Sequence, residues 1–212
     1  MKGPRRAALV AAVVASLAEP VHAGRPQAQE LVAEGDALAA AGDRDGALAR
    51  YRAAVVEDPD LIVAYDHAVP LWFATQRWDE AGRYLERATV RHPEWPGGWY
   101  ALGFVYRKTN RADAAVAAYQ EYAALRPGEA APWYGLAASF EMAGDVTNAV
   151  RAWRRYRALE RDADRALYRA EAERAIDRLL GPPHGWRDAM RRWMTDGGGA
   201  AAARRVTVAF PE

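Results

Sequence analysis

The sequence contains no cysteine among its 212 residues. This absence excludes disulfide scaffolds, cysteine-ligated zinc or iron–sulfur sites, thiol nucleophiles and cysteine-linked lipid anchors. An excess of either charge is also absent, because 29 Lys and Arg stand against 28 Asp and Glu, a formal net charge of +1. That balance argues against a dedicated nucleic-acid-binding protein. With 51% hydrophobic and 27% charged residues, the composition is typical of a folded soluble protein.

Recognisable catalytic motifs are missing as well. The sequence has no H-E-x-x-H, no G-x-S-x-G and no G-x-x-x-x-G-K-[ST]. His67, His92 and His184 have no carboxylate or second histidine at metal-ligand spacing within a helix. We therefore expect no enzymatic activity, no bound metal and no cofactor, and interpret these histidines as solvated or packed side chains.

Residues 1–23 have the organisation of a secretory signal. Three basic residues lie within the first six positions, and an uncharged, mostly apolar run follows over 7–18. Val21 and Ala23 supply small side chains at the −3 and −1 positions of a cleavage site. The apolar run is too short to span a bilayer, so cleavage is favoured over a retained anchor. We expect an exported, periplasmic protein, and the lack of cysteine excludes a lipoprotein. Cleavage would change the formal net charge from +1 to −1, because it removes three basic residues and one acidic residue.

The dominant feature of the sequence is a repeat of fixed period. Five columns of similar residues recur every 34 positions without an insertion. The columns are Leu31, Tyr65, Trp99 and Trp133; Leu38, Trp72, Tyr106 and Phe140; Ala47, Ala81, Ala115 and Ala149; Tyr51, Leu85, Tyr119 and Trp153; and Pro59, Pro93 and Pro127.

These columns resemble the tetratricopeptide-repeat (TPR) family, whose 34-residue helix–turn–helix unit has W-x2-L-G-x2-Y in its first helix and A-x3-F, then P, in its second. The third repeat matches best. It contains Trp99, Leu102, Gly103, Tyr106, Ala115, Tyr119 and Pro127. The second repeat departs most, with Val69 in the glycine column followed by Pro70, and the fourth has Ala137 and Arg161 in place of Gly and Pro. The resemblance covers residues 28–161.

The columns fall at helical spacing and predict an all-α fold, a right-handed α-solenoid of about four helix–turn–helix repeats. The expected helices cover 28–41, 44–57, 62–75, 78–91, 96–109, 112–125, 130–143 and 146–159. The repeats occupy 24–161, divided as 28–61, 62–95, 96–129 and 130–161. A charged helix at 163–180, within a segment 162–180, is expected to cap the array. A decayed fifth repeat is the alternative.

Several single residues are expected to shape the repeats. The small alanine column should let the two helices of each repeat approach closely. Asp45, Asp79 and Asp113 recur at the start of the second helices, where they are expected to cap free N–H groups and favour the helix dipole. Pro70 should make the first helix of the second repeat kink or start late.

The resemblance implies that the first helix of each repeat lines a concave groove that holds a peptide segment of a partner protein. First-helix positions outside the core columns are then the candidate binding residues. They are Asp66, Phe73, Tyr100, Phe104, Arg107, Lys108, Tyr134 and Glu141. The aromatic members with charges at their rim suit a peptide that carries a few apolar anchors. The Asn/Lys/Arg clamp that some family members use for a terminal carboxylate is not reproduced.

The C-terminal segment 181–212 has three parts. A short amphipathic helix is predicted after Pro183, then a Gly/Ala linker, then a weakly alternating stretch over 205–210 that is a strand candidate or a disordered tail. One face of the helix carries Trp186, Met190, Trp193 and Met194. Packing of this face on the repeats is favoured over its use as a docking helix at a partner or a membrane surface.

The sequence therefore predicts a non-enzymatic protein-interaction scaffold in the cell envelope. Two alternatives remain open. One is a self-assembling homo-oligomer in which groove and tail of neighbouring molecules engage. The other is an accessory subunit of an enzyme or glycan-handling system, in which groove aromatics stack on sugars.

Overall fold

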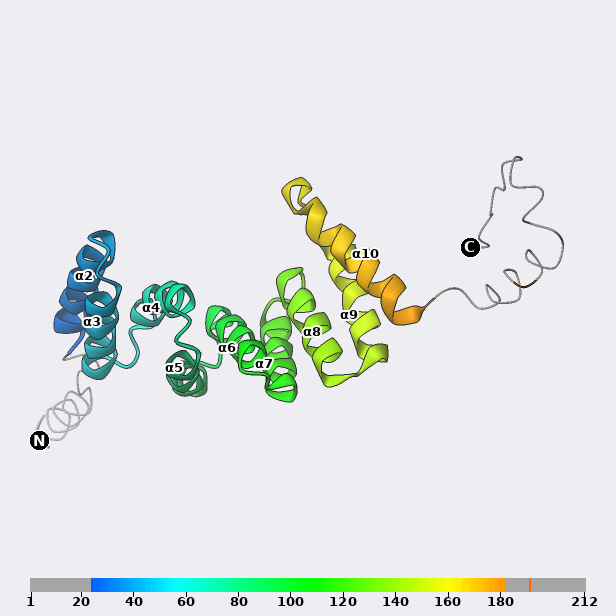
Figure 1. The fold of residues 1–212 in the computed structure, drawn as a ribbon. Coiled ribbons are helices and arrows are strands. Elements are labelled where there is room, and N and C mark those ends of the chain that lie inside the picture. Colours follow the sequence, from blue (N-terminus) through cyan, green and yellow to red (C-terminus); the bar gives the residue numbers. More distant parts are fainter. Residues whose placement is uncertain (1–23, 182–190, 192–212) are drawn as a thin grey trace, which may run out of the picture. The chain divides into compact units, whose positions relative to one another are not determined.

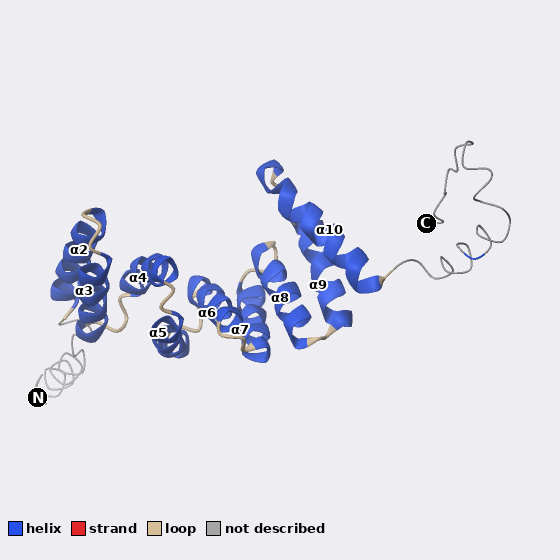
Figure 2. Ribbon diagram, in the orientation of Figure 1, coloured by secondary structure: helices blue, strands red, loops and turns tan. Residues whose placement is uncertain are grey.

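The computed structural model describes residues 24–181 and Arg191. Every element in this part of the chain is helical (Figures 1 and 2). The α-helices are α2 (Arg25–Ala40), α3 (Arg44–Glu57), α4 (Ile62–Thr75), α5 (Trp78–Arg91), α6 (Pro96–Lys108), α7 (Ala112–Leu125), α8 (Ala131–Ala143), α9 (Val146–Leu159) and α10 (Ala166–Leu180). A 3-10 helix, η1 (Ala163–Arg165), precedes α10. The expected all-α repeat fold is confirmed, and the bounds of α3, α4, α5, α7 and α9 agree with those predicted.

The chain divides into two compact units after Gly128. Unit 1 contains α2 to α7, and unit 2 contains α8, α9, η1 and α10. Within each unit a helix packs chiefly on the next one along the chain. The signal segment 1–23, the docking-helix residues Trp186, Met190, Trp193 and Met194, and the strand candidate at 205–210 lie outside the described residues. Among the residues that are described, no helix combines the length and apolarity needed to cross a membrane.

The alanine column behaves as predicted. Ala47, Ala81, Ala115 and Ala149 are fully buried, each at 0% exposure. Each lies in the first turns of a second helix, where a larger side chain would separate the two helices of its repeat. The close approach of the paired helices therefore depends on this column.

The four turns within the repeats share one backbone conformation. Gly42, Gln76, Asn110 and Gly144 occupy equivalent positions, 34 residues apart, and all have a left-handed φ of 54° to 87°. Glycine adopts this region without steric cost and asparagine tolerates it, whereas other side chains are disfavoured there.

The predicted helix caps require a correction. Asp45, Asp79 and Asp113 lie inside the first turns of α3, α5 and α7 and are not the N-cap residues. A side-chain cap forms only at the two second helices whose preceding residue is aspartate. Asp43 accepts a hydrogen bond from Gly46 N, and Asp145 accepts one from Asn148 N. The three recurring aspartates are placed to interact with the helix dipole instead.

Pro70 does not delay its helix. Helix α4 begins at Ile62 and continues through Pro70 to Thr75, so the expected late start is wrong. Pro70 is not among the buried residues of α4, whose buried side includes Ala68 and Trp72.

Helix α10 buries a narrow face of small and branched side chains, Ala172, Ala175 and Ile176. Its remaining surface carries exposed charged residues, among them Glu173, Arg174, Asp177 and Arg178. A terminal helix of a repeat array needs one side that packs on the preceding helix and one polar side that faces solvent, and α10 has both.

Candidate functional site

Two of the aromatic residues predicted for the groove of unit 1, Phe73 and Phe104, lie together. Phe73 on α4 stacks on Phe104 on α6, with ring centroids 4.7 Å apart and planes 27° apart. Trp78, the first residue of α5, packs against both rings at 5.7 and 5.9 Å. All three side chains are half-buried. We call this group the aromatic cluster; it lies where the first helices of the second and third repeats meet.

The last turn of α6 carries two cations, Arg107 and Lys108, and Lys108 lies beside the cluster. The Lys108 ammonium is 5.3 Å from the centroid of the Phe104 ring, within the range of a cation–π interaction. The Nε of Arg107 is buried and has no hydrogen-bond partner within the described residues. Neither side chain forms an ion pair with any residue in the described part of the chain. The cluster is therefore flanked by positive charge that this part of the chain does not neutralise.

Tyr100 extends the same helix face one turn toward the start of α6. Its ring makes edge contacts with Tyr119 and Tyr122 of α7, at 6.1 and 5.7 Å. The residue nevertheless remains 40% exposed. It is a positioned aromatic side chain with part of its surface open to a partner.

Asp66, a further predicted groove residue, already has a partner inside unit 1. Its Oδ1 accepts a hydrogen bond from the indole N–H of Trp95 at 3.1 Å. Burial raises the pKa of the Asp66 carboxyl, while the Trp95 hydrogen bond acts in the opposite direction. This residue ties α4 to the turn before α6.

His67, next to Asp66, is a packed histidine of the kind expected from the sequence. Its Nδ1 lies 2.7 Å from Asp36 Oδ1, which also accepts a hydrogen bond from the Tyr51 hydroxyl. Among residues 24–181 and Arg191, no group of three metal-ligating side chains is placed to hold an ion.

The two groove candidates of unit 2 are engaged by its own helices. Tyr134 packs against Trp153, Tyr156 and Tyr168, and its hydroxyl donates to Glu171 Oε1 at 3.0 Å.

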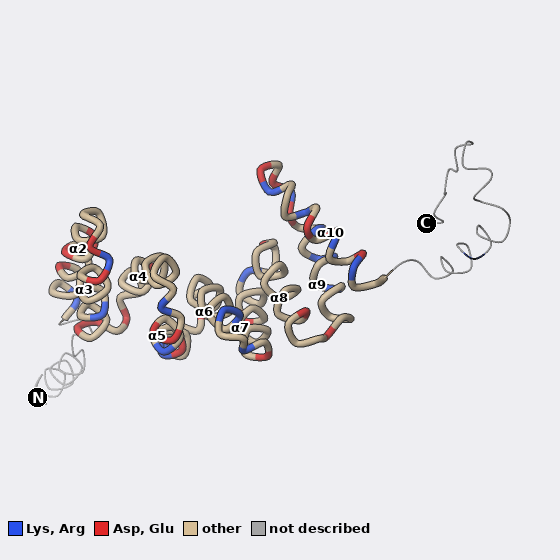
Figure 3. The backbone as a smooth tube through the Cα atoms, viewed as in Figure 1, with Lys and Arg blue, Asp and Glu red and all other residues tan. Residues whose placement is uncertain are grey.

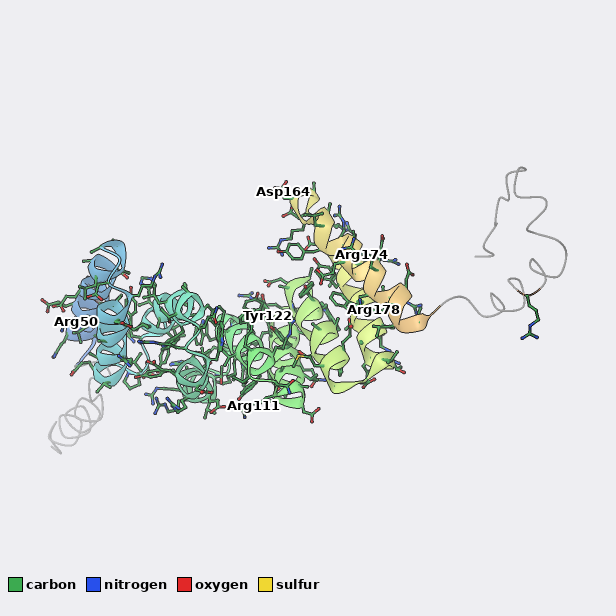
Figure 4. The ribbon with its side chains drawn as sticks, viewed as in Figure 1. Arg50, Arg111, Tyr122, Asp164, Arg174 and Arg178 are labelled. Atoms are coloured by element: carbon green, nitrogen blue, oxygen red, sulfur yellow. The ribbon has the colours of Figure 1, made fainter. Side chains whose placement is uncertain are left out.

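Glu141 accepts hydrogen bonds from the Trp153 indole at 2.6 Å and from Arg178 at 2.5 Å. Arg178 and Glu171 both belong to α10, and Figure 4 labels Arg178 on that helix. Helix α10 therefore supplies partners to both residues that the sequence nominated on α8.

Trp78 was not predicted as a site residue from the sequence. It falls outside the aromatic columns, and the equivalent residues of the other repeats are Arg44, Ala112 and Val146. The available signal was an aromatic residue at a repeat position that is otherwise charged or small.

The chain is similar to several solved structures. A crystal structure of MamA aligns with a TM-score of 0.58 and 22% identity over 69% of this chain and 92% of that chain. MamA from Desulfovibrio magneticus aligns with a TM-score of 0.56 and 22% identity, covering 65% and 77%. TTC0263, a thermophilic TPR protein in Thermus thermophilus, aligns with a TM-score of 0.52 and 18% identity, covering 80% and 83%.

The chain has the tetratricopeptide-repeat fold. The structural similarity to TTC0263 supports this fold, and the 34-residue columns of the sequence support it independently. Comparison with models of protein families and with curated protein sequences found no match. At identities of 18–22% the similarities establish the repeat fold alone. The function has to be argued from the residues of this chain.

Proposed function

We propose that this protein is a non-enzymatic protein-interaction scaffold of the cell envelope, which binds a peptide segment of a partner protein on the first-helix face of unit 1. The observation that carries the proposal is the aromatic cluster with Lys108 beside it and Arg107 on the same turn of α6. None of these five side chains belongs to the columns that the repeat core requires. The tetratricopeptide-repeat fold also supports a protein-interaction role.

The chemistry of this face defines the peptide. Apolar side chains of the partner would pack on the aromatic cluster and on Tyr100, because aromatic surfaces supply much of the affinity of peptide interfaces. An acidic side chain of the partner would lie near Lys108 and Arg107, where it gains a charge-assisted hydrogen bond. We expect an apolar segment adjoining a carboxylate.

The test is a comparison of three baits carrying residues 24–212. The wild-type protein is compared with Tyr100→Ala/Lys108→Glu, which changes the proposed face, and with Tyr168→Ala, which removes a 51% exposed tyrosine from α10 in unit 2. Circular dichroism establishes that each bait is folded. Proteins captured from an envelope extract are then produced separately, and their affinities are measured by calorimetry.

The proposal requires a partner whose affinity falls at least about tenfold with the double variant, as expected for loss of contacts worth about 1.4 kcal/mol or more, and stays unchanged with Tyr168→Ala. Equal affinities for all three baits would place binding elsewhere on the chain.

The envelope part of the proposal rests on the signal-like segment 1–23. It predicts that the protein isolated from its source begins at Gly24, which N-terminal sequencing determines. A protein that retains Met1 and fractionates with the cytoplasm would contradict export while leaving the peptide-binding test unaffected.

A further inference from the structure

A cavity of about 670 Å³ opens on unit 1 beside the turn between α4 and α5. It is broadly open to solvent, and its lining is mostly polar. Arg52 of α3, Gln76 and Arg77 of the turn, and Trp78 and Asp79 of α5 contribute to its wall. Trp78 thus lines the cavity and also belongs to the aromatic cluster.

The arginines of α3 and of the turn are already paired. Arg52 Nη1 donates to Glu80 Oε1 at 2.7 Å, and Arg77 Nη2 donates to Asp45 Oδ1 at 2.6 Å. Arg77 also lies 3.7 Å from Glu80 Oε2. Each guanidinium therefore has a carboxylate partner, and each group keeps spare N–H donors or lone pairs.

The remaining charges of the cavity also balance. Asp79 and Arg83 line the cavity one helical turn apart on α5, a helix that carries both acidic and basic residues (Figure 3). Neither forms an ion pair with another residue of the described chain. An anionic ligand would meet the Asp79 carboxylate as well as the Arg83 guanidinium, so it gains little. A neutral ligand with hydroxyl groups can use both, since a hydroxyl donates and accepts.

The backbone at the cavity carries a residue that the turn does not favour. Gln76 adopts a φ of 54°, whereas two of the three equivalent turns use Gly42 and Gly144. A glycine at this position would remove the steric cost of the left-handed conformation. Gln76 lines the cavity and has a primary amide in its side chain, and local strain of this kind is often retained at functional positions.

We propose that this cavity binds a neutral oligosaccharide. The apolar face of one sugar ring stacks on Trp78, and the Gln76 amide donates to and accepts from its hydroxyl groups. Asp79 and Arg83 bind hydroxyls of the neighbouring sugar. The site lies at the α4–α5 turn and does not depend on the peptide-binding function proposed for the first-helix face.

Isothermal titration calorimetry on the purified protein tests the proposal with cellotriose, maltotriose and N,N′-diacetylchitobiose as probes. Sodium phosphate serves as the anionic comparison. We expect at least one saccharide to bind saturably at one site per chain, with phosphate neither binding there nor competing. Absence of saturable binding for all three saccharides, or competition by phosphate, would overturn the proposal.

Two turn variants separate binding from stability. Gln76→Gly should raise Tm by a few degrees, because it relieves the left-handed strain, yet weaken saccharide binding by about fivefold to tenfold, the loss of one hydrogen bond. Asn110→Gly, the matched change in the next repeat, should raise Tm without changing affinity. If Gln76→Gly keeps the wild-type affinity, the amide is not part of a site.

Trp78 is tested with two substitutions because it also packs on Phe73 and Phe104. Trp78→Ala should abolish measurable binding, and Trp78→Phe, which keeps an aromatic ring in the packing, should weaken it. Tyr100→Ala should leave the affinity for the saccharide unchanged and lower the affinity for the peptide partner. That pattern distinguishes failure of this site from failure of the proposed scaffold function. Wild-type affinity in Trp78→Ala would overturn the stacking role.

Discussion

At Gly35 and Gly103 the missing side chain leaves room for a tyrosine ring of the second helix. A Cβ at Gly35 would lie 2.5 Å from the Tyr51 ring, and one at Gly103 would lie 2.9 Å from the Tyr119 ring. Both tyrosines are buried and cannot move aside without disturbing the core. In the second repeat the glycine column holds Val69 and the tyrosine column holds Leu85. The larger side chain of Val69 is thus found where the opposing residue has no ring.

Two glycine substitutions should therefore have opposite effects. Gly103→Ala should lower the free energy of unfolding by about 1–3 kcal/mol, because the added methyl overpacks against Tyr119. Gly82→Ala, in the interior of α5, should raise it by about 0.5–1 kcal/mol, because its Cβ meets only Val105 at an ordinary 3.5 Å and alanine favours the helix. Urea denaturation measures both. Equal effects of the two changes would show that the Tyr119 ring yields freely.

At the scale of the element, helix starts are capped unevenly. Helices α3 and α9 have aspartate N-caps with a side-chain hydrogen bond, whereas the N-caps of α5 and α7 are Arg77 and Arg111, which make none. The turn residue before the helix thus decides whether a cap forms, since an arginine side chain cannot accept a bond from backbone N–H groups.

The α9 cap predicts a pH dependence. The backbone N–H of Asn148, and then its side-chain amide, hold the pKa of the Asp145 carboxyl below its usual value. A lowered folded-state pKa stabilises the protein above the unfolded pKa, and that stabilisation is lost as pH falls through the folded pKa. Asp145→Ala should therefore lower Tm at about pH 7, and the difference from wild type should shrink as pH falls through the folded-state pKa of the carboxyl. Thermal melts across pH check this, with Asp113→Ala as the uncapped control.

Helix α10 depends on its small-residue face. Ala172→Arg places a long charged side chain at a position with 0% exposure, so α10 should detach from α9. Limited proteolysis should then cut first between 161 and 181. Arg174→Glu, at an exposed position of the same helix, should leave the wild-type digestion pattern. Resistance of Ala172→Arg to proteolysis would mean that α10 is held by contacts other than this face.

At the scale of the molecule, contacts are local along the chain. In unit 1 each helix packs on its sequence neighbours, and the first helix α4 also packs on the first helices before and after it, α2 and α6. Stability in repeat proteins is accordingly a sum over units and their nearest neighbours.

Because the contacts are local, a destabilising substitution should loosen mainly the helices of its own repeat. Gly35→Ala should reduce amide hydrogen-exchange protection in α2 and α3, whereas Gly103→Ala, the same change two repeats later, should reduce it in α6 and α7. Hydrogen exchange measured by mass spectrometry reports each helix separately. A uniform loss of protection throughout unit 1 with either variant would instead indicate one global unfolding unit.

The sequence by itself determined the helices and their pairing. The columns that recur every 34 residues mark the apolar face of each helix, and the alanine column marks where two helices approach closely. It nominated Phe73 and Phe104, since they are aromatic residues outside the core columns. Only the tertiary structure decided that these rings stack on each other and on Trp78, and that α10 provides partners for Tyr134 and Glu141. It also decided that Gln76 adopts a left-handed turn conformation beside a cavity whose arginines Arg52 and Arg77 are paired with carboxylates. Such contacts depend on the distances between separate helices, which a repeat pattern along one chain does not encode.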